Sequence, residues 1–111
     1  MKNCYIGCAL KATGGKWKIL IIWTISQNGV IRFNDLQRKV DGISSLMLSK
    51  NLKELEKDCL VIRHQYNEIP PRVEYKLSEL GQKLTVVLES LGKWGSELYE
   101  YKKQQDKSIT R

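Results

Sequence analysis

The segment that decides the fold runs from Asp41 to Leu77 and reads DGISSLMLSKNLKELEKDCLVIRHQYNEIPPRVEYKL. After an initial turn it predicts a helix that Ser44 or Ser45 caps and that continues to about Asp58. Apolar residues fall on one side of this helix, and the opposite side carries Leu46, Ser49, Lys50, Lys53 and Lys57. Such a cationic face on a helix about 10–12 Å across suits the major groove of B-DNA, although a solvated lysine face is the simpler alternative.

The second half of this segment predicts two strands that a stiff loop joins. Residue types alternate over 60–66 and again over 72–77, and two consecutive prolines restrict the loop between them. In this register His64 shares the inward-looking side of Ile62 and Tyr66, so we expect a packed side chain rather than a base or a metal ligand. A basic helix followed by a β-hairpin is the arrangement of a recognition helix and its wing.

The residues that precede this segment predict three helices and a short strand. A short amphipathic helix begins near Tyr5 and ends at a pair of glycines. The helix from Lys16 to about Gln27 is apolar on nearly every side, which is typical of a buried central helix. Residues 30–33 form a short strand, and Asn34 then caps a helix through about residue 40, with Gln37 as its capping-box partner.

The residues after the hairpin predict one long helix, which Ser78 caps. Apolar residues recur along it four and three apart, at Leu80, Leu84, Val87, Leu91, Trp94, Leu98 and Tyr101. This heptad spacing extends about three turns beyond what one small core needs. The polar tail from Lys102 onward is expected to fray.

Together these elements predict an α+β fold, mainly helical: a winged helix-turn-helix with N- and C-terminal helices for dimerisation. All 111 residues are expected to form one domain, with a core of about 4–98 and a tail over 102–111. The longest apolar run, Ile19–Trp23, is too short to span a bilayer and no signal peptide opens the chain, so a cytoplasmic protein is expected. The sequence contains no catalytic relay and no Cys-x-x-Cys clamp, so we expect no enzyme, no cofactor and no metal site.

Charge is unevenly distributed along the chain. The net charge is +7, and residues 1–39 hold seven basic side chains against one acid, Asp35. A basic chain favours a polyanionic partner, either nucleic acid or an anionic membrane surface. With the helix and hairpin described above, double-stranded DNA is the expected partner, and no membrane contact is expected.

Six short blocks carry a resemblance to a known family. They are Gly14-Gly15-Lys16-Trp17, Arg32-Phe33-Asn34-Asp35-Leu36, Gly42-Ile43-Ser44, Leu52-Lys53-Glu54-Leu55-Glu56, Pro70-Pro71-Arg72-Val73-Glu74-Tyr75 and Leu77-Ser78-Glu79-Leu80-Gly81. In order and spacing they resemble the HxlR-type bacterial transcription regulators, relatives of the MarR group, over roughly residues 4–98. The resemblance implies a homodimeric winged-helix repressor or activator that dimerises through its terminal helices.

The resemblance also implies a sensor cysteine. In this family a cysteine near the N-terminus often senses electrophiles or oxidants, and Cys4 occupies its position when counted back from Gly14-Gly15. The alternative for Cys4 is an inert, half-buried thiol. Two residues depart from the family pattern, because Tyr5 stands where proline is usual and Cys59 stands where a glycine closes the recognition helix. Cys59 costs on the order of 1 kcal/mol if that left-handed backbone is kept, and we expect it to pack as a small apolar residue.

The candidate DNA contacts fall into three groups. On the recognition helix they are Ser45, Leu46, Ser49, Lys50 and Lys53. On the wing they are Gln65, Asn67 and Arg72. Arg72 would approach a narrow minor groove, unless it forms a structural ion pair with Glu68 or Glu74. The candidate contacts to backbone phosphates are Lys16, Arg32 and Arg38.

The candidate dimer residues are Tyr5, Leu91, Trp94, Leu98 and Tyr101, and the alternative is a last helix folded back on its own core. We therefore expect a homodimer that binds a pseudo-palindromic operator with half-sites about one helical turn apart. Either a small ligand between the terminal helices or chemistry of an electrophile at Cys4 would move the two recognition helices relative to each other. Two alternatives stay open: a winged-helix module for protein interaction without a direct DNA role, and a small-molecule or flavin-binding protein.

Overall fold

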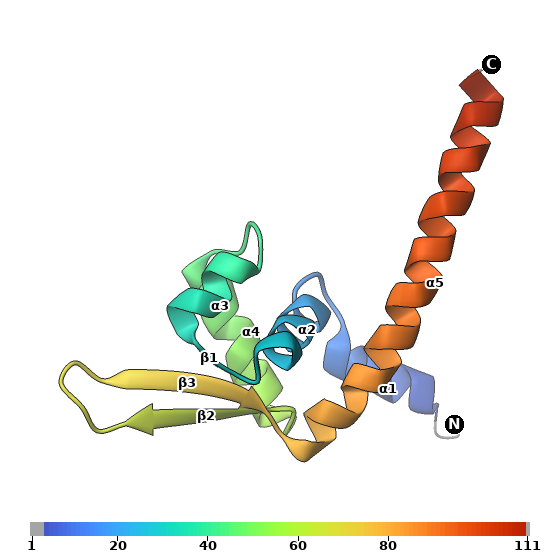
Figure 1. Cartoon of the computed structure of the whole chain (residues 1–111). Coiled ribbons are helices and arrows are strands. Elements are labelled where there is room, and N and C mark those ends of the chain that lie inside the picture. Colours follow the sequence, from blue (N-terminus) through green and yellow to red (C-terminus); the bar gives the residue numbers. More distant parts are fainter. Residues whose placement is uncertain (1–3, 111) are drawn as a thin grey trace.

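The computed structural model describes the backbone of residues 4–110 and the side chains of residues 4–106. Within these residues the chain forms five helices and a three-stranded antiparallel sheet (Figure 1). In chain order the elements are α1 (Tyr5–Thr13), α2 (Lys18–Asn28), β1 (Val30–Arg32), α3 (Phe33–Lys39), α4 (Ser45–Lys57), β2 (Val61–Tyr66), β3 (Arg72–Leu77) and α5 (Glu79–Thr110). This order confirms the predicted winged helix-turn-helix.

The core of the fold forms around α2, which packs against α3, α4, α5 and the sheet. Fully buried aliphatic side chains fill it, from Ile21, Ile22 and Ile25 of α2 to Leu36 of α3 and Leu48, Leu52 and Leu55 of α4. The expected buried central helix is therefore present. It begins at Lys18 rather than Lys16, because Gly15 adopts a φ of +90° and the next residues form a bend before the helix starts.

The sheet has the strand order β1-β3-β2, and its two faces differ in burial. One face packs on the helices and buries Val61 opposite Leu77. On the other face His64 is exposed, and its ring meets that of Tyr66 edge-on with the centroids 4.3 Å apart. The prediction of an inward-facing His64 is therefore wrong. The alternation is offset by one because Leu60 lies in the turn before β2 and not in the strand.

The start of α3 also differs from the sequence prediction. The helix begins at Phe33, and Arg32 occupies the cap position without a side-chain hydrogen bond to the helix. Asn34, predicted as the cap, lies inside the first turn, because β1 leads directly into the helix. Gln37, predicted as its capping partner, instead donates from Nε2 to the carbonyl oxygen of Ile43 at 3.3 Å. This hydrogen bond ties α3 to the turn before α4.

Ser78 caps α5 as predicted and also joins this helix to the turn after α4. Its Oγ accepts the amide hydrogen of Gly81 at 3.0 Å and donates to the carbonyl oxygen of Cys59 at 2.6 Å. Glycine is required at position 81 because a Cβ atom would clash with the carbonyl oxygen of Leu60. Residues 102–110, which the sequence predicted to fray, continue α5 as helix; Lys and Gln lead this stretch and no glycine or proline interrupts it.

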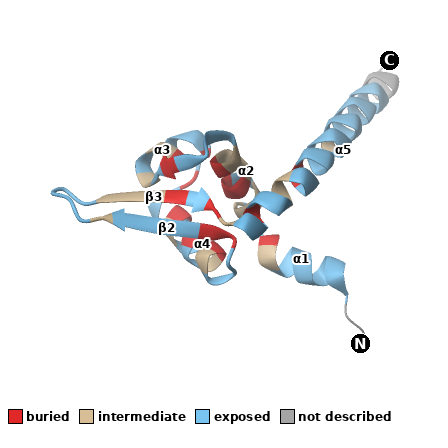
Figure 2. Ribbon diagram, turned by 60° about the horizontal axis from the view of Figure 1, so that its bottom comes forward, coloured by how far each residue is buried: buried red, intermediate tan, exposed pale blue. Residues whose placement is uncertain are grey.

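α1 and the far part of α5 project from the winged-helix body (Figure 1). Figure 2 shows the buried residues gathered in the body, whereas the two projecting helices are mostly exposed. Among the described side chains, Thr13 is the buried residue of α1, and the buried residues of α5 end at Leu88. None of the helices in the described part of the chain combines the length and the apolar character needed to cross a membrane.

Candidate nucleic-acid interface

α4 has two faces of opposite character. Ser44 caps the helix, because its Oγ accepts the amide hydrogen of Met47 at 3.1 Å. On the core side Asn51 is buried and donates from Nδ2 to the carbonyl oxygen of Met47 at 2.8 Å. On the outer side Leu46 is 81% exposed. The expected DNA contacts share this outer side: Ser45, Leu46, Lys50 and Lys53 are exposed, and Ser49 is half-buried.

A hollow of about 470 Å³ separates α4 from the helix-facing side of the sheet. Ser49 and Lys53 line it from α4, and Arg63 lines it from β2. Arg63 is absent from the sequence-based candidates, although its alternation with the buried Val61 could have placed it on this face. Gln65 follows on the same face and accepts a hydrogen bond from Nη2 of Arg63 at 3.2 Å. The wing therefore adds an exposed cation beside the lysines of α4.

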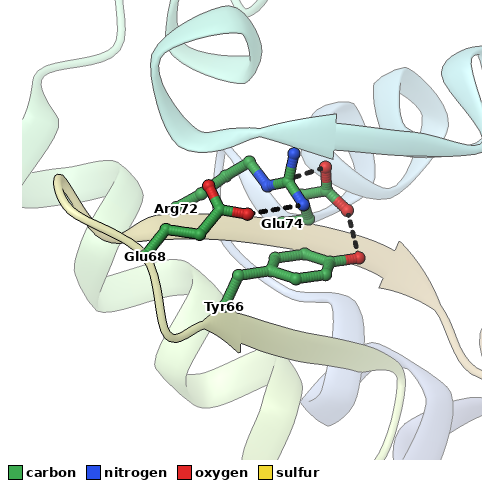
Figure 3. A network of polar contacts seen from close by, with 4 residues as sticks. All are labelled: Tyr66, Glu68, Arg72 and Glu74. Carbon is green, nitrogen blue, oxygen red and sulfur yellow. Dashed lines mark hydrogen bonds and ion pairs between the residues drawn. The ribbon is translucent and has the colours of Figure 1, made fainter.

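Arg72 lies on the other face of the hairpin, in a polar network (Figure 3). Its Nη2 lies 3.3 Å from Oε2 of Glu68, and its Nε lies 3.7 Å from Oε2 of Glu74. The guanidinium also stacks 3.9 Å from the ring centre of Tyr66. The structure therefore contains the ion pairs of Arg72 with Glu68 and Glu74 that the sequence offered as an alternative. Asn67, the other loop candidate, is exposed.

Tyr66 completes this network from β2. Its hydroxyl donates to Oε1 of Glu74 at 3.0 Å (Figure 3). This hydrogen bond to a carboxylate, with partial desolvation of the hydroxyl, raises the pKa of Tyr66 above its ordinary value of 10. The neutral tyrosine is thus the form that the network stabilises.

The three expected phosphate contacts do not lie together. Arg32 and Arg38 are exposed and line a hollow of about 620 Å³ between α3 and the wing loop. Arg38 forms an ion pair with Asp35 within α3. Lys16 lies before α2, with its Nζ 4.7 Å from the ring centre of the adjacent tryptophan. Lys16 is not among the residues that line the hollow with the two arginines.

An ion pair between a largely buried lysine and a partly exposed glutamate joins α2 to α4. Nζ of Lys18 lies 2.8 Å from Oε1 of Glu54, and the lysine side chain is 11% exposed. The hydrogen bond and the positive charge of Lys18 lower the pKa of Glu54 below its ordinary value of 4.5. The nearby Lys50 and Lys57 lower the pKa of Glu54 further, to a smaller extent.

The described cysteines, Cys4, Cys8 and Cys59, are exposed and form no disulfide. Cys4 is the cap of α1, and its Sγ accepts the amide hydrogen of Gly7 at 3.2 Å. The prediction that Cys59 packs as an apolar residue is wrong, because it occupies the turn that ends α4. Its φ is +65°, and the next amide, of Leu60, donates to the carbonyl oxygen of Leu55 at 2.9 Å. The left-handed backbone expected at this position is kept.

The five expected dimer residues are exposed in the single chain: Tyr5 78%, Leu91 47%, Trp94 59%, Leu98 38% and Tyr101 63%. α1 adds the exposed Ile6 and Leu10. Next to α5, an apolar hollow of about 460 Å³ opens between α2 and α5, lined in part by Trp23 and Leu91. α5 projects beyond its own core, so the alternative of a folded-back helix is absent (Figure 1). Single exposed apolar residues are ordinary, but a series along two projecting helices is typical of an interaction surface.

These elements define a winged helix-turn-helix protein of the kind found in MarR-like transcription regulators. The HxlR-like helix-turn-helix family model matches residues 12–103. The chain therefore belongs to the HxlR-like helix-turn-helix family, and it is a DNA-binding transcriptional regulator of the helix-turn-helix type.

Similar proteins carry regulatory names. MalR of Fusobacterium mortiferum, named as a regulatory protein, is 45% identical over 95 residues, which are 86% of this chain and 90% of MalR. The crystal structure of YtcD, named as an HTH-type transcriptional regulator, matches with a TM-score of 0.82 at 37% identity and covers 88% of this chain and 99% of that chain. The redox regulator HypR in its reduced form matches with a TM-score of 0.84 at 33% identity, over 91% of this chain and 99% of that one.

Proposed function

We propose that this protein acts as a homodimer that binds a pseudo-palindromic operator and releases it in response to a chemical signal. The observation that carries the DNA part is the outer face of α4, where Lys50 and Lys53 are exposed, with Arg63 across the hollow beside it. A cationic helix next to a projecting hairpin suits a major groove, with the wing over the flanking minor groove.

The contacts separate into two kinds. The side chains that reach base edges, or in the case of the two lysines also the phosphates beside them, come from the outer face of α4: Ser45, Leu46, Ser49, Lys50 and Lys53. Hydroxyls and ammonium groups bond to base acceptors, and a leucine packs on a thymine methyl group. The side chains that hold the sugar-phosphate backbone are Arg63, Gln65 and Asn67 of the hairpin, with Arg32, Arg38 and Lys16 farther out. Backbone contacts fix the register of the protein on the duplex and supply most of the salt dependence.

The apolar faces of α1 and α5 support the homodimer. A second copy that packs on them would cover Tyr5, Leu91, Trp94, Leu98 and Tyr101, which are between 38% and 78% exposed in the single chain. A twofold pair would place its two α4 helices one helical turn apart, about 34 Å, at one fixed separation. Sequence specificity then requires both subunits, because one half-site holds only one helix.

Two routes of regulation would change the distance between the two α4 helices of the dimer. Cys4 exposes its thiol at the start of α1, and α1 belongs to the proposed dimer surface, so oxidation or alkylation there would move helices that set the spacing. Similarity to the redox regulator HypR supports this route. The apolar hollow between α2 and α5 favours the second route, a small apolar ligand.

A selection from random-sequence duplexes with purified full-length protein tests the DNA function. We expect recovery of an inverted repeat whose affinity falls steeply with salt, by about 0.9 in log K per unit of log salt for each phosphate contacted. A protein that retains no duplex, or whose binding is weak and insensitive to salt, would favour the alternative of a protein-interaction module.

Release of the selected duplex by diamide tests the cysteine route. We expect wild type and Cys8→Ser to lose DNA on treatment and to recover it on reduction, whereas Cys4→Ser stays bound. Cys8 is the matched control because it is also exposed and lies one turn farther along α1. Equal release from wild type and Cys4→Ser would contradict the cysteine route and leave the ligand route.

A further inference from the structure

The tip of the wing is apolar. Ile69 is fully exposed, at 102%, and two prolines follow it in the loop between β2 and β3. This loop reaches far from the body, at the end of the hairpin (Figure 1). One exposed isoleucine alone is ordinary. At Ile69 the side chain stands at the end of a projecting loop that prolines stiffen, so a partner that covers it has little backbone freedom to remove.

The charges next to the tip are already paired. Glu68 precedes the tip and Arg72 follows it, and the two side chains meet at 3.3 Å across the base of the loop (Figure 3). Arg72 also stacks on Tyr66 and lies near Glu74, so its side chain is only 29% exposed. Arg72 is therefore held within the hairpin, and the large apolar side chain that the loop exposes is Ile69.

The position of the tip relative to α4 favours DNA as its partner. α4 contacts β2, and Lys53 of α4 lines the same hollow as Arg63 of β2, so the hairpin begins beside the outer face of the recognition helix. A wing in that position lies over the minor groove that flanks the major-groove site. The hollow that Ile69 borders is also lined by Arg32, an exposed cation that could meet a phosphate beside the groove, and by Arg38, which is paired with an acid of its own helix. Isoleucine and proline are among the side chains that proteins insert into minor grooves as apolar wedges.

We propose that Ile69 enters the minor groove beside each half-site as an apolar wedge that partly unstacks one base step, and that Arg72 is a positioning residue that holds the loop for it. This inference rests on the proposed function and names a specificity element within it. Pyrimidine–purine steps such as TA unstack most easily. The operator should therefore prefer such a step in the flank, at a position that α4 does not touch.

The test uses the duplex recovered by the selection, with 2-aminopurine in place of adenine in both flanks, and full-length protein. We expect wild type to raise the 2-aminopurine fluorescence at one flanking step. For Ile69→Ala we expect that rise to disappear and the affinity to fall about tenfold, with an unchanged dependence on salt because an apolar contact releases no counterions. Because Ile69 is fully exposed, its replacement leaves the folded chain intact.

Two matched variants keep this test specific. Ile69→Val retains a branched apolar tip and should bind within about twofold of wild type. Ile62→Ala removes another exposed isoleucine of the same hairpin, 43% exposed and away from the tip, and should behave as wild type.

The positioning role of the network around Arg72 has its own test, because Tyr66→Phe removes the hydrogen bond to Glu74 without a change of charge. We expect it to weaken the 2-aminopurine signal while the protein stays dimeric and folded.

Equal affinity and equal fluorescence for wild type and Ile69→Ala would overturn the wedge, leave the α4 assignment standing and direct the search for a partner of the tip to proteins. A changed salt dependence in Ile69→Ala would overturn it too, because charge and not apolar contact would then have been lost. Failure of wild type to retain any duplex would overturn both the wedge and the proposed function.

Discussion

α4 and the wing hairpin are neighbours that both carry basic residues, but their basic side chains are available to a partner to different degrees. On α4 Glu54 pairs with Lys18 of α2, and Lys50 and Lys53 are exposed on the outer face. On the wing Arg72 is held by two carboxylates and an aromatic ring, and the tip exposes Ile69 instead. The difference shows that the type of a residue does not fix its role, because the neighbours on the same face decide whether a charge is free to meet DNA.

The largest effect is expected from separating the two copies that present these elements. Trp94→Glu places a charge in the apolar series of α5 and should give a monomer. Its affinity for the selected duplex should fall by more than about a hundredfold, because the second half-site no longer binds within the same complex. Analytical ultracentrifugation and fluorescence anisotropy measure the two quantities. Ser96→Glu adds the same charge on the opposite side of α5 and should remain dimeric; a dimeric Trp94→Glu would contradict the assigned interface.

The next effect distinguishes the two faces of the hairpin. Arg63→Gln, on the α4 side, should weaken binding about tenfold and reduce the salt slope by about 0.9, as expected for one lost phosphate contact. His64→Gln, the adjacent position on the outer face, should leave both quantities unchanged. Salt titrations of both variants on one duplex check this pair. The reverse result, with His64 the sensitive position, would mean that the outer face of the sheet meets DNA.

Local periodicity was sufficient to predict the recognition helix. Leu48, Leu52 and Leu55 repeat with the period of a helix, so the buried face and the exposed lysines opposite it could both be read from the sequence. The cap at Ser44 follows the same local rules. These features depend on neighbours within a few residues, which is why the structure agrees with them.

The hairpin could not be predicted in the same way, because its contacts depend on register. A shift of one residue moves every side chain to the other face of the sheet. With Leu60 placed in the strand, the sequence predicted His64 on the helix-facing side, and Arg63 was therefore not recognised as a candidate DNA contact. The network around Arg72 needs Tyr66 directly opposite it, and only the pairing of β2 with β3 brings them together. The sequence offered an ion pair for Arg72 as an alternative but no means to choose it.

The turn between α4 and the hairpin offers a smaller effect, and here the substitution should stabilise the protein instead of weakening its function. Cys59 ends α4 with a φ of +65°, a conformation that glycine adopts without steric cost. Cys59→Gly should therefore raise the free energy of unfolding by about 1 kcal/mol. Urea denaturation of the dimer at fixed protein concentration measures the change. Cys59→Ala retains the Cβ atom and should show no such gain; equal stabilisation by both variants would point to the thiol rather than to the backbone.

The smallest effect concerns the titration of the wing network. Because the hydrogen bond to Glu74 raises the pKa of Tyr66 above 10, this tyrosine stabilises the fold at lower pH, and the contribution is lost as pH rises through the folded pKa. In Glu74→Gln the pKa of Tyr66 should fall toward 10, so this pH-dependent contribution to the free energy of unfolding should become smaller. NMR titration of the tyrosine Cζ resonance follows this shift. An unchanged pKa of Tyr66 in Glu74→Gln would contradict the network in Figure 3.

The salt dependence of DNA affinity for a double variant, Lys50→Ala with Lys53→Ala, tests most directly whether α4 is the element that reads DNA. We expect its plot of log K against log salt for the selected duplex to be shallower than that of wild type by about 2 units, as expected for two lost contacts, with a large drop in affinity at low salt. Lys83→Ala, an exposed lysine on α5, should give a plot parallel to wild type. A double variant whose plot superimposes on that of wild type would contradict the central claim that DNA lies against the outer face of α4.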